Sequence, residues 1–137
     1  MSVSPDIAAL LLKSRSVAVV GLSPKVDRPS HRVARYLQRV GYRVVPVNPH
    51  HHVVLGERCY PSLAAAARDH RIDVVDVFRR SAYAGTVVDE AIPLAPQLIW
   101  LQQGVVDEAA AARATAAGIP CVMDRCLAVD HQQLEAQ

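Results

Sequence analysis

The chain has 137 residues, of which 51% are hydrophobic and 20% charged, so it can fill a sizeable core and is predicted to fold as a single domain, residues 1–137. Its formal net charge of +2 is too small for a general nucleic-acid binder or a membrane-surface protein. Its apolar runs fall far short of the roughly 20 residues that span a bilayer, and the first residues lack the basic start of a signal peptide. We therefore expect a cytoplasmic protein.

Short β-branched runs alternate with longer helical patterns along the chain. An opening helix is expected at residues 5–14, and apolar residues at helical spacing predict a second helix that ends at Gly41. Further helices are expected at residues 62–69, 83–95, 107–117 and 126–135. The runs at residues 17–20, 43–47, 73–78, 98–101 and 119–123 are nearly continuous in apolar character, as strands covered on both faces are. This alternation predicts an α/β fold with a parallel sheet.

The loop after the first strand carries groups that suit an anion. Its glycine allows a tight turn, its hydroxyls and cationic side chains are donors, and it leads directly into a helix N-terminus; these residues are Gly21, Ser23, Lys25, Arg28 and Ser30. In an open parallel sheet a ligand lies at the carboxyl ends of the strands, where this loop is expected. The alternative interpretation is a loop that only caps the helix.

Two features argue against an NAD site. The glycine fingerprint of dinucleotide-binding proteins is absent, because the sequence after Gly21 contains no second glycine at the required spacing. The end of the second strand, at Asn48, Pro49 and His50, also lacks the acidic residue that binds the ribose hydroxyls of NAD. A polar, partly basic cluster there suits a ribose that carries a phosphate, as in NADP or coenzyme A.

The loops after the third and fourth strands bring further groups to the same edge. Phe78 could pack on an adenine and Arg79 could pair with a phosphate, although a core aromatic beside a surface arginine is the alternative. Gln103 offers an amide and Gly104 permits close backbone approach, or serves as an ordinary turn glycine. Three consecutive histidines, residues 50–52, cannot all face one ion in an extended loop, so no metal site is predicted.

The three cysteines, Cys59, Cys121 and Cys126, form no CxxC pair and no zinc-site spacing, so neither a disulfide framework nor a metal centre is expected. Cys126 follows the fifth strand and begins the closing helix, which places it near the same edge. It is either a thiol packed under the last helix or a nucleophile that could form a mixed disulfide with a bound thiol.

Taken together, these motifs resemble the small stand-alone CoA-binding proteins, which are similar to the CoA-binding domain of the succinyl-CoA synthetase alpha subunit. The resemblance covers residues 14–134 and rests on residues 19–24, 28–30, 36–37, 41–42, 44–49, 76–79, 100–104 and 123–126. It implies a Rossmann-like, doubly wound parallel sheet of five strands in the order 3-2-1-4-5, with helices on both faces. The ligase reaction of the larger relatives does not carry over, since their second domain and ATP-grasp partner have no counterpart here.

The resemblance also assigns roles at the edge. Gly21, Ser23, Lys25, Arg28 and Ser30 would hold the CoA pyrophosphate; Asn48, Pro49 and His50 the ribose phosphate; Val77, Phe78 and Arg79 the adenine; and Gln103 and Gly104 the pantetheine. We expect binding of CoA or an acyl-CoA without catalysis. The alternatives are an NADP-dependent or acyl-transferring enzyme, and a subunit that docks on acyl-CoA enzymes and supplies their CoA site; a homo-oligomer is compatible with any of them.

Overall fold

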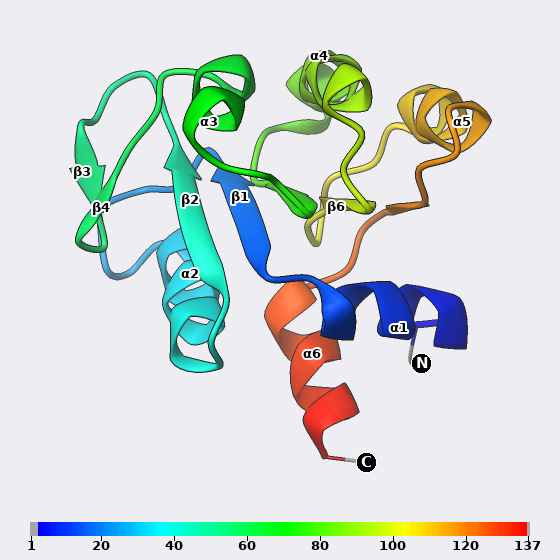
Figure 1. The fold of residues 1–137 in the computed structure, drawn as a ribbon, viewed down its shortest axis with the longest axis horizontal. Coiled ribbons are helices and arrows are strands. Elements are labelled where there is room, and N and C mark those ends of the chain that lie inside the picture. The colour runs from blue at the N-terminus through cyan, green and yellow to red at the C-terminus, as the bar shows by residue number, and fades with distance from the viewer. Residues whose placement is uncertain (1–2, 137) are drawn as a thin grey trace.

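The structure, a computed structural model, describes residues 3–136 and consists of a five-stranded parallel sheet between two layers of helices (Figure 1). The helices are α1 (Pro5–Lys13), α2 (Pro29–Arg39), α3 (Leu63–Asp69), α4 (Ser81–Ala91), α5 (Glu108–Ala116) and α6 (Leu127–Glu135), and a short 3₁₀ helix, η1 (Ile92–Leu94), continues α4. The sheet contains β1 (Ser16–Val20), β2 (Arg43–Val47), β5 (Val74–Val77), β6 (Leu98–Leu101) and β7 (Cys121–Val122). A separate hairpin is formed by β3 (Val53–Val54) and β4 (Glu57–Arg58).

The predicted α/β fold is confirmed, and each face of the sheet has its own helices. Helices α1, α2 and α6 cover one face, and α3, α4 and α5 cover the other (Figure 1). Successive strand residues point to opposite faces, so Val19 packs in the cluster under α2 and α6 while Val20 packs in the cluster under α3 and α4. All residues of β1, β5 and β6 are buried, as their continuous apolar character predicts.

Local sequence signals account for most of the helix ends. Asp107, the first residue of the helix expected at residues 107–117, is the N-cap of α5 and accepts a hydrogen bond from the Ala110 amide at 3.0 Å. Ser62 caps α3 in the same way, through a hydrogen bond from the Ala65 amide. Gly41 follows the C-terminal end of α2 and has a φ of 101°, a left-handed conformation that stops a helix. The fourth helix begins earlier than expected, at Ser81, and its last predicted turn is the 3₁₀ helix η1.

The strand order differs from the one that the resemblance implied. Numbered from 1 to 5 within the sheet, the strands lie in the order 2-1-3-4-5 rather than 3-2-1-4-5. The third sheet strand, β5, pairs with β1, with Val17 opposite Val74 and Val20 opposite Val77. As a result, β2 is an edge strand and does not lie between two neighbours.

Pro46 gives a physical reason for this order. The Val47 carbonyl faces β1, where it accepts a hydrogen bond from the Gly21 amide at 2.8 Å. Pro46, one residue earlier, therefore faces the outer edge, and its carbonyl accepts from the Tyr60 amide at 2.9 Å. A proline lacks the amide proton that a further strand would need at this position, so Pro46 favours an edge location for β2.

The β3–β4 hairpin was not predicted from the sequence. It is short, and Leu55 and Gly56, both with positive φ, form its turn. The Gln38 side chain of α2 donates to the Leu55 carbonyl at 3.2 Å, which fixes the hairpin beside α2.

Within residues 3–136, no helix is long and apolar enough to cross a membrane.

Candidate functional site

The carboxyl ends of β1 and β5 lie side by side at the point where the direction of the chain crossover reverses. From β1 the chain reaches β2 through α2 on one face of the sheet, and from β2 it reaches β5 through α3 on the other face. Loops leaving these two strands therefore diverge to opposite faces and leave a crevice between them.

Gly21 closes the base of this crevice. It has a φ of 89°, and a Cβ atom built on it would lie 2.4 Å from the Phe78 carbonyl oxygen. Any side chain at Gly21 would therefore collide with the backbone that follows β5, as well as adopt a backbone conformation that favours glycine. The absence of a side chain lets the loops after β1 and β5 meet.

The loop between β1 and α2 is held by its own hydroxyl groups. The Ser23 amide donates to the Ser30 hydroxyl at 3.0 Å, and the Lys25 amide donates to the Ser23 hydroxyl at 3.1 Å. His31, which is buried, lies with its Nδ1 atom 3.0 Å from the Ser23 carbonyl. Ser23 and Ser30 thus shape the loop, and each hydroxyl that accepts here still has a proton to donate.

The N-terminus of α2 carries no side-chain cap. Arg28 occupies the N-cap position without a side-chain hydrogen bond to the helix, and no acidic residue lies in the first turn. Lys25 and Arg28 are both exposed beside this end of the helix. The positive end of the helix dipole and two cations therefore occupy the same place, which is suited to a phosphate group.

Asn48 connects the end of β2 to the same loop. Its Nδ2 atom donates to the Leu22 carbonyl at 3.0 Å, and its Oδ1 atom accepts from the His50 amide at 3.0 Å. Both functional atoms of the amide are therefore engaged in holding backbone. Pro49 and His50 follow at the exposed rim.

Two hollows open at this edge, one on each face of the sheet, and Arg79 lines both. The larger, of about 580 Å³, lies on the α2 and α6 face; it is lined by Pro29, Arg32, Val33, Phe78, Arg79, Gln102, Gln103, Val105 and Cys126. The smaller, of about 220 Å³, lies between α3 and α4; its lining includes Gly21, Pro49, Ser62, Arg79 and Tyr83. Arg79 therefore lies between the two hollows, and Gly21 lines the smaller one.

The structure brings most of the predicted site residues to this edge but not all of them. Phe78 and Gln103 line the larger hollow, whereas the Val77 side chain is fully buried in the core on the α3 and α4 face and presents no surface. Gly104 is engaged with other groups: its amide donates to the Asp124 carboxylate at 2.7 Å, and its carbonyl accepts from the Ser81 hydroxyl at 3.4 Å.

Several residues at the edge were not in the predicted set. Arg32 lies one helical turn after Arg28, so its spacing alone could have placed it on the same side of α2. Tyr83 contributes a ring 5.6 Å below the Arg79 guanidinium, which orients that arginine between the two hollows. Neither Tyr83 nor Ser62 carries a local sequence signal for a role at this edge, because α4 and α3 reach it only through the tertiary fold.

Closing helix α6 is anchored tightly at its start. The Leu127 amide donates to the Gln102 side chain at 3.1 Å, and Arg125 forms two hydrogen bonds with the Asp130 carboxylate, at 2.6 and 2.8 Å. The half-buried Cys126 is the N-cap residue of α6 and lines the larger hollow. Its position agrees with the expectation that it approaches the carboxyl edge.

The other two thiols are less available. Burial raises the pKa of Cys121 to about 11, with a further contribution from the nearby Asp107 carboxylate. Burial also raises the pKa of Cys59, whose thiol donates a hydrogen bond to the Asn48 carbonyl at 3.4 Å.

Asp76 is a buried acid on the larger hollow's side of the sheet. It lies in β5, opposite Val19 and Trp100, and its carboxyl group is fully buried without a hydrogen-bond partner among residues 3–136. Burial raises its pKa well above the ordinary value of an aspartate. Alternate residues of a strand point to the same face, so Asp76 faces the same side of the sheet as Phe78 and lies two residues farther from the carboxyl edge.

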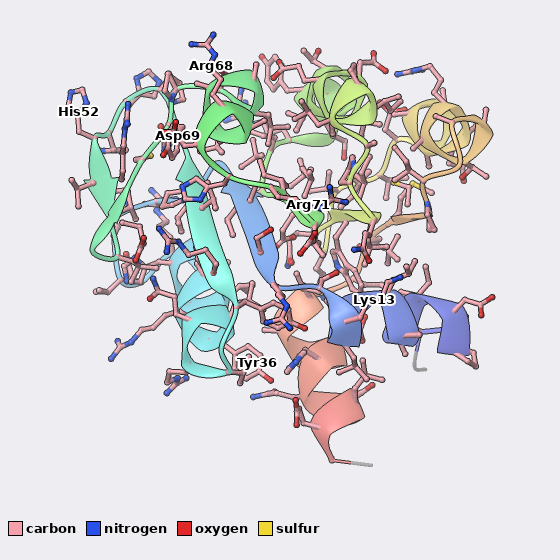
Figure 2. The ribbon with its side chains drawn as sticks, viewed as in Figure 1. Lys13, Tyr36, His52, Arg68, Asp69 and Arg71 are labelled. Carbon is pink, nitrogen blue, oxygen red and sulfur yellow. The ribbon has the colours of Figure 1, made fainter. Side chains whose placement is uncertain are left out.

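The three histidines after β2 do not converge. Figure 2 shows His52 projecting outward beside the β3–β4 hairpin, away from the sheet. Within the part of the chain that the structure describes, no group of three or more His, Cys, Asp or Glu side chains could hold a metal ion.

Comparison with known proteins identifies close relatives. A model of the CoA binding domain family matches residues 15–132. An uncharacterized protein of Bacillus subtilis (strain 168), YneT, is 39% identical over 126 residues, which cover 92% of each chain. The structure of cell-free ID.343 from Thermus thermophilus is 37% identical, covers 96% of this chain and 99% of that chain, and superposes with a TM-score of 0.87.

A larger protein contains the same fold. The dinucleotide-forming acetyl-coenzyme A synthetase 1 of Ca. Korarchaeum cryptofilum matches with a TM-score of 0.74 at 21% identity, over 85% of this chain and 27% of the synthetase. At this identity the likeness concerns the fold alone.

Proposed function

Because the chain belongs to the CoA binding domain family, we propose that it binds coenzyme A or an acyl-CoA in the crevice between β1 and β5. The observation that carries the proposal is the pair of hollows that share Arg79 as a lining residue, beside a cationic loop and an uncapped helix N-terminus. Coenzyme A is elongated, with a pyrophosphate between its nucleotide and pantetheine ends. The crevice offers anion-binding groups in the middle and less polar surfaces at both ends.

The positions of the side chains and the backbone support a set of proposed contacts. The loop from Gly21 to Ser30, with Ser23, Lys25 and Arg28, would bind the pyrophosphate through hydroxyls, cations and backbone amides. Asn48 would act by holding this loop, with Pro49 and His50 at the rim near the ribose phosphate. Arg79, which lines both hollows, would contact the adenine, whereas Phe78 lines the same hollow as Gln103 and would pack on the pantetheine rather than on the adenine that the resemblance implied. Val77 and Gly104 would shape the edge without touching the ligand.

Binding without catalysis is the form of this function that the site favours. No hydrogen bond within residues 3–136 joins a serine hydroxyl or a cysteine thiol to a histidine ring, which is the pairing that activates a nucleophile. His31, the histidine closest in sequence to the loop, is buried and hydrogen-bonded to backbone. The larger hollow would therefore hold a thioester without a positioned base.

Calorimetric titration with CoA, dephospho-CoA, NADP and NAD tests the proposal. We expect CoA to bind more tightly than NADP or NAD, because the site has neither the glycine fingerprint nor the ribose-binding acid of a dinucleotide site. Heat released with NADP and none with CoA would refute CoA binding and favour the reductase alternative.

A further inference from the structure

Four arginines form a row along the solvent-facing side of α2. They begin at the N-cap and recur at intervals of four, three and four residues; they are Arg28, Arg32, Arg35 and Arg39, which we call the arginine row. At 3.6 residues per turn they fall within an arc of about 60° and extend for about 16 Å along the helix. All four are exposed, and the buried side chains of α2 lie on its other side.

The arginine row has no carboxylate partner within residues 3–136. The ion pairs of this part of the chain involve other cations, and no acidic residue occurs in α2 itself. Arg32 donates to the Asp27 backbone carbonyl at 2.6 Å, which leaves its charge uncompensated. Arg28 and Arg32 also lie at the positive end of the helix dipole, where arginines are unfavourable and an anionic ligand would offset the repulsion.

The arginine row begins at the proposed site and continues past it. Arg32 lines the larger hollow, but Arg39 lies about 10 Å farther along the helix axis. A small ligand seated in the hollow accounts for Arg28 and Arg32 and leaves the distal half of the row unexplained. An anionic partner larger than the ligand in the hollow would engage this distal half at the same time.

A single row of cations matches a row of carboxylates on a helix better than it matches a nucleic acid. Acidic residues at intervals of three and four on a partner helix recur with the same spacing as the arginines. The chain as a whole balances 15 basic against 13 acidic residues, so a broad basic surface of the kind that tracks phosphate backbones is not expected. Arginine also binds carboxylates in a bidentate manner, which favours a specific protein contact.

We propose that the arginine row docks the acidic helix of a carrier protein whose phosphopantetheine arm enters the larger hollow. The proposal rests on the proposed function, because such an arm is the part of coenzyme A that the hollow is proposed to hold. The carrier would attach its arm through a phosphate, which would lie at the uncapped end of α2, and its helix would lie along Arg35 and Arg39. The protein would then bind acyl groups carried on a protein as well as on coenzyme A.

The test measures binding of three probes: free CoA, an acyl carrier protein with its phosphopantetheine arm, and the same carrier without the arm. The variant is Arg35→Glu/Arg39→Glu, which reverses only the distal half of the arginine row. The control, Arg68→Glu/Arg113→Glu, changes the net charge equally at exposed arginines of α3 and α5, which cover the opposite face of the sheet from α2 (Figure 1).

We expect the wild type to bind the arm-bearing carrier more tightly than the armless one. The distal reversal should weaken carrier binding by at least about tenfold, because it places like charges in contact. It should leave the dissociation constant for CoA unchanged within about twofold, since both residues are exposed and outside the hollow. The control variant should keep both affinities.

Two results would overturn the carrier proposal while leaving CoA binding intact: a wild type that binds CoA but not the carrier, and carrier binding that survives the distal reversal. Tighter binding of duplex DNA than of the carrier in the same buffer would also overturn it. Absence of CoA binding in the wild type would instead refute the proposed function itself.

Discussion

The candidate site requires glycine at position 21, because the backbone after β5 occupies the space that a side chain there would need. Gly21→Ala would introduce a Cβ atom 2.4 Å from the Phe78 carbonyl and force alanine into a positive φ. Gly41→Ala is a matched control, because Gly41 also has a positive φ but a Cβ there would meet nothing within 4 Å. The difference between the two variants therefore isolates the collision from the backbone strain.

We expect Gly41→Ala to lower the free energy of unfolding by about 1 kcal/mol, and Gly21→Ala to lower it by about 2–4 kcal/mol and to abolish CoA binding. Urea denaturation and calorimetry measure the two effects. Equal losses of stability in the two variants would show that the loops after β1 and β5 can move apart without cost.

Arg28 is the exposed cation nearest the uncapped end of α2, and its substitution tests the anion site directly. A charge-assisted hydrogen bond to a phosphate contributes roughly 1.5–3 kcal/mol, so Arg28→Ala should raise the dissociation constant for CoA by about ten- to a hundredfold. Arg68→Ala, which removes an exposed arginine from α3, is the control. An affinity for CoA that is unchanged in Arg28→Ala would mean that this arginine is only solvated.

At the scale of elements, α6 completes the larger hollow, because it begins at Cys126 and is tied to β6 through the Leu127 and Gln102 hydrogen bond. This position allows the thiol to report on the ligand. Cys126 should react with a thiol-specific reagent faster than Cys121, whose pKa is raised to about 11. Saturating CoA should slow the labelling of Cys126.

Mass spectrometry of the labelled protein, with Cys126→Ser as the control, follows each thiol separately. Labelling of Cys126 that is indifferent to CoA would place the ligand away from the larger hollow. The same experiment with CoA disulfide decides between the two interpretations of this thiol: a gain of CoA mass in the wild type but not in Cys126→Ser identifies a mixed disulfide, and no gain identifies a packed, inert thiol.

Most elements could be predicted because their signals are local. Nearly continuous apolar runs predicted the strands at residues 43–47 and 98–101 with the observed ends. Asp107 marks a helix start through its capping side chain, and Gly41 marks a helix end through its positive φ. The order of the strands depends on whether β5 pairs with β1 or with β2, and tertiary packing decides this. Pro46 held the one local clue to that order, since its missing amide proton requires an edge.

The residue composition of the site was harder to predict than its location. The carboxyl edge follows from the parallel sheet, but Val77 faces the core and Arg32 faces the hollow because of strand register and helix rotation. Tyr83 and Ser62 come from helices whose approach to the edge is set by packing across the sheet. Motif resemblance identifies the chain segments at a site more readily than the direction of each side chain.

For the whole molecule, the buried carboxyl of Asp76 makes stability depend on pH. Because burial raises its pKa, the folded protein retains a proton that the unfolded chain has released above the ordinary aspartate range. This contribution is fully present below that range and is lost as pH rises toward the raised pKa, by about 1.4 kcal/mol for each pKa unit of difference. His131, whose pKa is lowered by burial, acts in the opposite direction: its contribution is lost as pH falls.

Comparison of the wild type with Asp76→Asn separates the two groups, since both proteins retain His131. The free energy of unfolding of the variant relative to the wild type should increase with pH, because the amide cannot ionise. Denaturation at a series of pH values measures this difference, with the exposed Asp6→Asn as a control. A constant difference at all pH values would show that Asp76 does not retain its proton in the folded state.

The larger hollow takes its walls from distant parts of the chain, with α2 on one side and Cys126 on the other. A ribosome adds residues from the N-terminus at about 5–20 per second, so the cationic loop and α2 are synthesised long before α6. The larger hollow is therefore complete only after nearly the whole sheet has been synthesised. Folding on the ribosome must begin without the full set of contacts that the proposed ligand would make.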